Sequence, residues 1–151
     1  MPYDDLRKGR VSIAEHAYFV TTVTKGRRPV FSDLYHARCV VQEMRRLQAE
    51  AALSSLAWVL MPDHLHWLFQ LRDGWELAEV MKRLKARTAR EINRREGSAG
   101  TLWQRAYYDH GLRENEDPLG IARYIVANPL RAGLVKRIED YPHWDSHWLD
   151  E

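Results

Sequence analysis

The residues best placed to do chemistry are two histidines separated by one residue, His64 and His66. They follow the dipeptide Pro62-Asp63 and begin an apolar segment that is predicted as a strand. In a strand, alternate side chains share one face. Both imidazoles would then project from the same side of a rigid element, where two histidines can bind one divalent metal ion. The pair alone is a weak signal, because strand histidines are often only half-buried and hydrogen-bonded. Asp63 could also ligate, but alternation directs it to the other face, so a turn-capping or histidine-orienting role is favoured.

A candidate nucleophile, Tyr124, lies far downstream in the segment I-A-R-Y-I-V-A-N-P. It falls off the apolar face of a predicted helix and shares a side with Asn128, one turn later. A tyrosine of the core would join the apolar stripe, although partly exposed helical tyrosines are also common. Asn128 precedes a proline, which disfavours helical geometry there. It is either a helix C-cap or an oxygen-donating third metal ligand.

Positive charge is concentrated in a few segments, although 23 Lys and Arg nearly balance 21 Asp and Glu. Between residues 82 and 95 the only acid is Glu91, whereas a solvated helix face normally mixes signs. We therefore favour contact with a phosphate backbone, which arginine can bind bidentately, over a merely solvated face. The stripe consists of Arg83, Arg87, Arg90 and Arg94. Two further clusters extend the same DNA footprint or only solubilise loops, and they contain Arg7, Arg10, Arg27 and Arg28.

The bulk properties are those of a globular domain. The 151 residues are 45% hydrophobic and 29% charged, which predicts a single domain spanning 1–151, with a tail from about residue 137 that packs on the body or is mobile. The single cysteine, Cys39, excludes internal disulfides and multi-cysteine zinc motifs, and we predict that it is a core residue. No stretch of about 18 apolar residues and no signal core is present, so we expect no membrane partner and a cytoplasmic location.

Hydrophobic periodicity predicts the element order β-α-β-β-α-β-α. A strand at 17–24 precedes a helix that begins after Ser32, a plausible N-cap, and ends near residue 51. Two strands flank Pro62-Asp63, and a second helix ends at the glycines following residue 96. The segment 102–112 is predicted as the last strand, and a helix begins at Asp117-Pro118. This order indicates an α+β, ferredoxin-like sandwich with a mainly antiparallel sheet.

With these motifs together, the chain resembles the single-tyrosine transposases of the His-hydrophobic-His (HUH) nuclease superfamily. Within them it is most similar to the transposases associated with repetitive extragenic palindromes (REP-associated tyrosine transposases, RAYT). The resemblance covers nearly the whole chain and is carried by the blocks Y-F-V-T-T-V-T, W-V-L-M-P-D-H-L-H-W-L-F, L-W-Q-R-A-Y-Y-D-H and R-Y-I-V-A-N-P-L-R-A-G-L-V.

The resemblance implies that His64 and His66 hold Mg²⁺ or Mn²⁺ and that Tyr124 attacks a DNA phosphate, giving a 5′-phosphotyrosine link and a free 3′-hydroxyl. Asn128 stands where relatives carry the amide that completes the metal site, although many of them have Gln there. The substrate would be single-stranded DNA beside a hairpin, in a bacterial, nucleoid-associated setting. No small-molecule cofactor is implied, and the protein would act as a monomer or a homodimer.

Three other functions compete with this hypothesis. A histidine-triad nucleotide hydrolase needs a further histidine at the next alternate position, where this chain has Leu68. A domesticated DNA-hairpin-binding regulator would keep the fold without cleavage. A metal-dependent phosphodiester hydrolase would use bound water, with Tyr124 structural.

Overall fold

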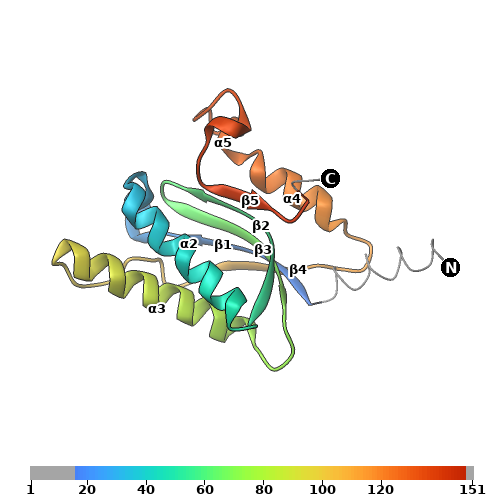
Figure 1. Ribbon diagram of the computed structural model, residues 1–151, viewed down its shortest axis with the longest axis horizontal. Helices are drawn as coiled ribbons and strands as arrows, with labels where there is room; N and C mark the ends of the chain where they lie inside the picture. Colours follow the sequence, from blue (N-terminus) through green and yellow to red (C-terminus); the bar gives the residue numbers. More distant parts are fainter. Residues whose placement is uncertain (1–15, 149–151) are drawn as a thin grey trace.

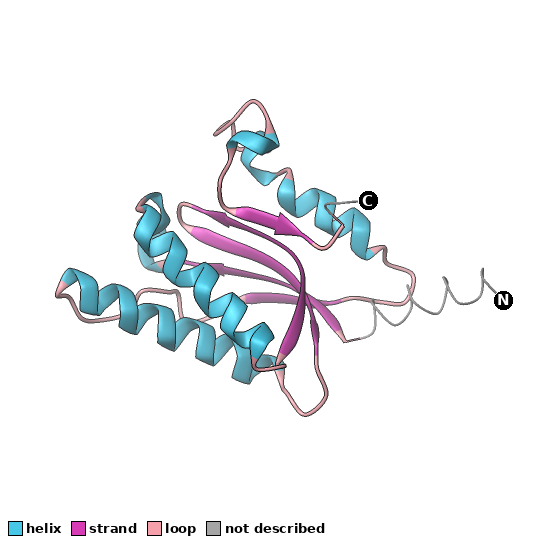
Figure 2. Ribbon diagram, viewed as in Figure 1, coloured by secondary structure: helices cyan, strands magenta, loops and turns pink. Residues whose placement is uncertain are grey.

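The computed structural model describes residues 16–148 as one antiparallel sheet with helices on both of its faces (Figure 1). Helices α2 and α3 cover one face, and α4 covers the other, as Figure 2 also shows. The strands are β1 (Ala17–Val23), β2 (Leu53–Met61), β3 (His64–Leu71), β4 (Tyr108–Gly111) and β5 (Trp144–Ser146). The helices are α2 (Leu34–Ala49), α3 (Leu77–Glu96), α4 (Pro118–Val126) and α5 (Asn128–Arg131). Short 3-10 turns cover Lys25–Arg27, Val30–Ser32 and Ile138–Asp140.

The strand order is β4-β1-β3-β2-β5, and every neighbouring pair is antiparallel. Strands β4, β1, β3 and β2 lie in the order of the ferredoxin-like arrangement. Helix α2 connects β1 to β2 and α3 connects β3 to β4, and both helices lie on the same face of the sheet. The predicted α+β class with an antiparallel sheet is confirmed. Strand β3 is central, with β1 and β2 on either side.

The main core lies between the sheet and the helices α2 and α3. Alternation along β3 sends Leu65, Trp67 and Phe69 into this layer, where all three are fully buried. The helices contribute apolar side chains at helical spacing, among them Leu47 and Leu84. This core fixes which face of β3 is left for chemistry.

A smaller core lies under α4 on the opposite face. Ala122 and Ile125 of α4 pack on Leu68 and on side chains of β2. The helix begins as predicted, since the Asp117 side chain accepts a hydrogen bond from the backbone N–H of Leu119 and Pro118 occupies the first turn. The packing therefore holds α4 against the face that carries the two histidines.

Three details differ from the sequence prediction. The N-cap of α2 is Asp33 rather than Ser32, because the Asp33 carboxylate accepts from two backbone N–H groups of the first turn. The segment 102–112 pairs as a strand only at 108–111, with an isolated bridge between Trp103 and Thr24. The tail adds a strand, β5, that sequence periodicity did not reveal, since it has only three residues and pairs with the edge of β2.

The described chain has no helix, within residues 16–148, with the length and apolar composition needed to cross a bilayer. Cys39 is half-buried beside the main core, in line with its predicted place.

Candidate active site

His64 and His66 lie side by side on the face of β3 that α4 covers. Their ring centroids are 4.7 Å apart, with ring planes inclined by 78°. They share this face with Leu68, which packs under α4, whereas the intervening Leu65 and Trp67 point into the main core. The alternation inferred from sequence is confirmed. The two imidazoles form one pair at the start of the central strand.

Each imidazole is fixed by a hydrogen bond at Nδ1. Nδ1 of His64 lies 2.7 Å from Oδ1 of Asp63, and Nδ1 of His66 lies 2.7 Å from Oγ1 of Thr21 on β1. Neither Nε2 atom has a hydrogen-bond partner among residues 16–148. Outer hydrogen bonds of this kind orient metal-binding histidines and select the tautomer that leaves the other nitrogen free. The pair therefore fits a divalent cation, with two Nε2 atoms as donors.

His66 is in the protonation state that a metal ligand requires. Burial lowers its pKa to about 4, with further contributions from the nearby charges of His64 and Arg131. The ring is accordingly neutral near pH 7, and a neutral imidazole offers a lone pair to a cation.

Tyr124 is accessible from solvent, as its position off the apolar face predicted. Its side chain is 56% exposed, although the neighbouring Ile125 is fully buried. The Arg131 guanidinium carbon lies 3.9 Å from the centroid of the Tyr124 ring. The charge of Arg131 is also one of those that lower the pKa of His66. Tyr124 belongs to α4, the helix that packs on the face of β3 that carries the imidazole pair.

Asn128 is not the helix C-cap. Ala127 occupies that position in α4, and Asn128 begins α5, where its carbonyl accepts from the N–H of Ala132. Its half-buried side chain has no hydrogen bond within the described part of the chain. No group of three His, Cys, Asp or Glu residues between 16 and 148 could hold a metal ion. A third protein ligand would have to be another residue type, which leaves the amide of Asn128 as the candidate from the sequence.

Two residues of this surface were missed by the sequence analysis. Thr21 is opposite His66 in the β1–β3 register, and a threonine in a β-branched strand gives no signal of its own. Arg131 is seven residues after Tyr124, two helical turns, so its spacing could have identified it. Tyr108, 63% exposed, is opposite Thr21 in β4 and therefore projects from the same face of the sheet.

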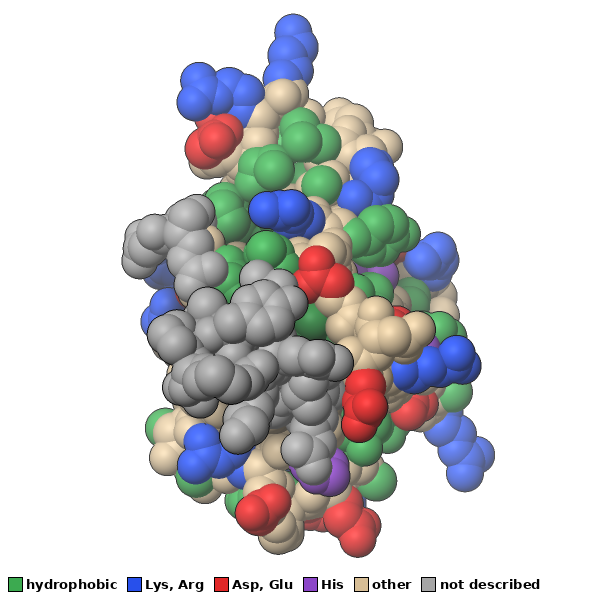
Figure 3. Space-filling view, turned by 90° about the vertical axis from the view of Figure 1, so that its right-hand side faces the viewer, with side chains coloured by type: hydrophobic (Ala, Val, Ile, Leu, Met, Phe, Trp, Pro, Cys, Tyr) green, Lys and Arg blue, Asp and Glu red, His purple; other side chains and the backbone are tan. Residues whose placement is uncertain are grey.

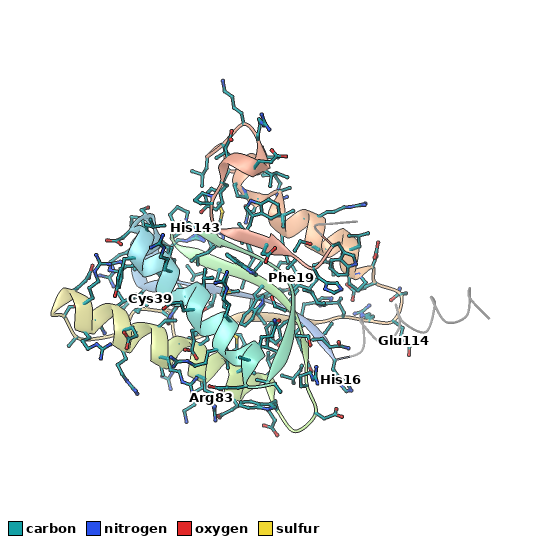
Figure 4. The ribbon with its side chains drawn as sticks, viewed as in Figure 1. His16, Phe19, Cys39, Arg83, Glu114 and His143 are labelled. Atoms are coloured by element: carbon teal, nitrogen blue, oxygen red, sulfur yellow. The ribbon has the colours of Figure 1, made fainter. Side chains whose placement is uncertain are left out.

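The arginine stripe lies on α3, across the sheet from the histidines, and Figure 4 shows Arg83 on this side. Arg83 is 2.9 Å from Glu79 and 3.3 Å from Glu50, whereas Arg87 is 2.8 Å from the buried Glu43. Glu43 lies in α2 and Glu50 directly follows it, so neither could be found by a count of charges along α3. Arg94 pairs with Glu91 at 2.6 Å. Arg90 is exposed and has no ion-pair partner within residues 16–148.

The other predicted basic contacts lie in two places. Arg27 is 3.6 Å from Oδ2 of Asp63, the carboxylate that also holds His64, and Arg28 is exposed nearby. Arg7 and Arg10 lie outside the described residues. On the face shown in Figure 3, the described Lys and Arg side chains are scattered among acidic ones rather than joined in one patch.

Comparison with known families decides the class of protein. The sequence profile of the family described as Transposase IS200 like matches residues 12–128. The chain belongs to the IS200-like transposase family. This span contains His64, His66, Tyr124 and Asn128, and it ends before Arg131.

Two curated relatives of this IS200-like transposase are named as REP-associated tyrosine transposases. The protein from Haemophilus influenzae is 25% identical over 144 residues, covering 86% of this chain and 79% of the relative. The protein from Escherichia coli K12 is 31% identical over 92 residues, covering 60% of this chain and 53% of the relative. The chain thus spans about half the length of the second relative.

Solved structures show the same fold. A REP-associated tyrosine transposase bound to a REP hairpin matches with a TM-score of 0.70 at 21% identity, over 85% of this chain and 75% of that one. A crystal structure described as a transposase from Deinococcus radiodurans matches with a TM-score of 0.54 at 22% identity, over 84% of this chain and 91% of that one.

Proposed function

We propose that this IS200-like transposase cuts and rejoins single-stranded DNA beside hairpins by nucleophilic attack of Tyr124. One observation supports this most directly. The solvent-accessible phenol is carried by α4, and this helix packs on the face of β3 that carries the oriented imidazole pair. The names of two relatives and the hairpin-bound structure support REP-like palindromes as the DNA class. Such a protein would work at the nucleoid in the bacterial cytoplasm.

The reaction exchanges one phosphodiester for another. The Tyr124 oxygen forms a bond to phosphorus and loses its proton to solvent, while the bond to the 3′-oxygen breaks and that oxygen takes a proton from solvent. The products are a 5′-phosphotyrosine and a free 3′-hydroxyl, and rejoining is the reverse step. A phenol is a weak nucleophile at neutral pH, so alignment and charge neutralisation must supply most of the acceleration.

The residues that would hold a metal ion are His64 and His66, through Nε2, with Asn128 as a third donor. Two imidazoles and an amide would leave further coordination sites for phosphate oxygens and water, which are the ligands that Mg²⁺ and Mn²⁺ prefer. When bound, such a cation would withdraw charge from the phosphate and stabilise the charge that develops on it. Asp63 and Thr21 would keep the donor atoms aimed at that position.

The test uses a 3′-labelled hairpin with a single-stranded flank, incubated with Mg²⁺ or Mn²⁺, because the 5′-phosphotyrosine link retains the 3′ fragment on the protein. We expect a covalent adduct with the wild type and none with Tyr124→Phe, which should keep hairpin binding. Tyr108→Phe is the matched control, because Tyr108 is an exposed tyrosine on the same face of the sheet. His64→Ala should abolish cleavage while the fold is retained.

The same assay separates the competing functions. Cleavage without any adduct, in the wild type and in Tyr124→Phe alike, would indicate a hydrolase that uses bound water. Hairpin binding without cleavage would indicate a regulator. An adduct that persists in Tyr124→Phe and disappears in Tyr108→Phe would move the nucleophile to β4.

A further inference from the structure

Arg131 lies over the ring of the proposed nucleophile. Its guanidinium carbon is 3.9 Å from the centre of the Tyr124 ring, and it has no carboxylate partner within residues 16–148. The arginines of α3 differ, since Arg83 and Arg87 are neutralised by glutamates of α2 and α3. An uncompensated cation therefore lies beside the proposed nucleophile.

The stacked geometry leaves the donor groups of Arg131 available. A guanidinium that packs its planar face on an aromatic ring keeps its N–H groups directed outward in the plane, where they can bind two oxygens of a phosphate. The ring in turn is attracted to the cation over its face, which favours this placement of the phenol. One side chain can thus hold the nucleophile and the group that it attacks.

The local backbone explains how Arg131 reaches this place. Helix α4 ends at Val126, and Ala127 links it to the single turn of α5. Pro129 is buried and anchors that turn, while Arg131 at its end remains exposed. The spacing of two helical turns from Tyr124 to Arg131 then brings the two side chains to the same side of the helical segment.

We propose that Arg131 binds the non-bridging oxygens of the scissile phosphate and, through its stack on Tyr124, sets the phenol oxygen in line with the bond to be broken. This inference rests on the proposed function and adds a substrate-binding group to it. No further reactant is needed, because Arg131 only donates hydrogen bonds to the phosphate and transfers no proton. Its positive charge balances the negative charge that develops on the phosphate oxygens as the new phosphorus–oxygen bond forms.

The experiment compares single-turnover adduct formation and hairpin affinity, with the protein in excess over labelled DNA. Arg131→Ala removes a donor to the phosphate, so we expect adduct formation to be about 100-fold slower than in the wild type. The hairpin affinity of this variant should change much less. Arg131→Lys keeps the charge but loses the planar stack and the paired donors, so its rate should be intermediate. Arg137→Ala is the control, because Arg137 is an exposed arginine of the same segment, paired with Glu139 at 3.5 Å.

Chemical rescue distinguishes a direct role from a structural one. Guanidinium ion at non-denaturing concentration should partly restore adduct formation in Arg131→Ala and should not affect Tyr124→Phe. An Arg131→Ala rate within about 2-fold of Arg137→Ala would overturn the inference, as would a loss that is explained entirely by weaker hairpin binding. If the wild type itself forms no adduct, the proposed function is wrong. If the wild type forms the adduct and the Arg131 variants form it as fast as Arg137→Ala, the proposed function holds and the inference about Arg131 is wrong.

Discussion

Oδ1 of Asp63 lies 2.7 Å from Nδ1 of His64, and the two residues are adjacent in the chain where the turn between β2 and β3 leads into β3. A second oxygen of the same carboxylate faces Arg27 at 3.6 Å. Both oxygens of the carboxylate are thus engaged by protein groups, and one of them orients the His64 imidazole of the proposed metal site. This agrees with the orienting role that strand alternation favoured for Asp63, and it connects the basic loop before α2 to the histidine pair.

Asp63→Ala is expected to weaken metal binding. Without the carboxylate, His64 can rotate and exchange tautomers, and loss of such an outer partner typically lowers metal affinity about 10- to 100-fold. Titration calorimetry with Mn²⁺ would measure the change. Asp73→Ala removes an exposed acid between β3 and α3 and serves as the control. Equal affinities for the two variants would contradict an orienting role.

Thr21→Val should have a similar effect on His66. The substitution keeps the shape of the side chain but removes the hydroxyl 2.7 Å from Nδ1, so we expect about a 10-fold loss of Mn²⁺ affinity. Thr22→Val is a closely matched control, because the next residue of the strand points to the opposite face. If Thr21→Val binds Mn²⁺ as the wild type does, the Thr21 hydroxyl has no part in the site.

Thr22→Val itself should stabilise the protein. The hydroxyl oxygen of Thr22 is buried without a hydrogen-bond partner in the described chain. Replacing it with a methyl group removes an uncompensated desolvation cost, which we estimate at about 1 kcal/mol of unfolding free energy. Urea denaturation measures this directly. A lower midpoint for the variant would show that the hydroxyl is satisfied in solution.

Arg90→Ala is the sharpest test of DNA contact by the α3 stripe. Arg90 has no acidic partner among residues 16–148, so its loss should reduce the slope of hairpin affinity against salt by about one and leave stability unchanged. Arg87→Ala is a poorer probe, because it leaves the buried Glu43 with only a 3.6 Å contact to Arg46. We expect that variant to lose about 1–3 kcal/mol of stability. An unchanged salt slope for Arg90→Ala would place the DNA elsewhere.

Tyr141 should make stability depend on alkaline pH. Burial raises its pKa to about 12, and its hydroxyl donates to the carbonyl of Leu60 at 2.6 Å. Since the unfolded phenol ionises near pH 10, stability present below that pH is lost as pH rises toward about 12. Tyr141→Phe should cost about 1 kcal/mol at neutral pH and flatten that decline, as thermal melts would show. A decline of the same steepness in the variant would assign it to another group.

Some elements follow from local pattern alone. The alternation along β3 placed His64 and His66 on one face, because Leu65 and Trp67 on the other face enter the core. The helical period likewise kept Tyr124 off the face on which Ile125 packs, and the structure confirms its exposure. Asp117 and Pro118 marked the start of α4 because capping chemistry is encoded within a few residues.

Other features depend on residues that are distant in sequence. The hydrogen bond between Thr21 and His66 joins positions 45 residues apart, and only the β1–β3 register brings them together. Glu43 of α2 and Glu50 at its C-terminal end pair with Arg83 and Arg87 of α3, so the charge of the stripe depends on helix packing. His36 is likewise buried between the carbonyl of Val30 and the carboxylate of Glu96, a placement that depends on the packing of α2 against α3.

The sequence by itself determined the class of fold, the imidazole pair and the accessible phenol, because each depends on a periodicity that a short segment carries. Tertiary structure decided which face of the sheet they share, which hydrogen bonds fix the two rings and which cation accompanies Tyr124. Those relations arise from strand register and from the packing of α4 on β2 and β3. Long-range contacts of this kind have no local signature, since the partners meet only when the whole sheet has formed.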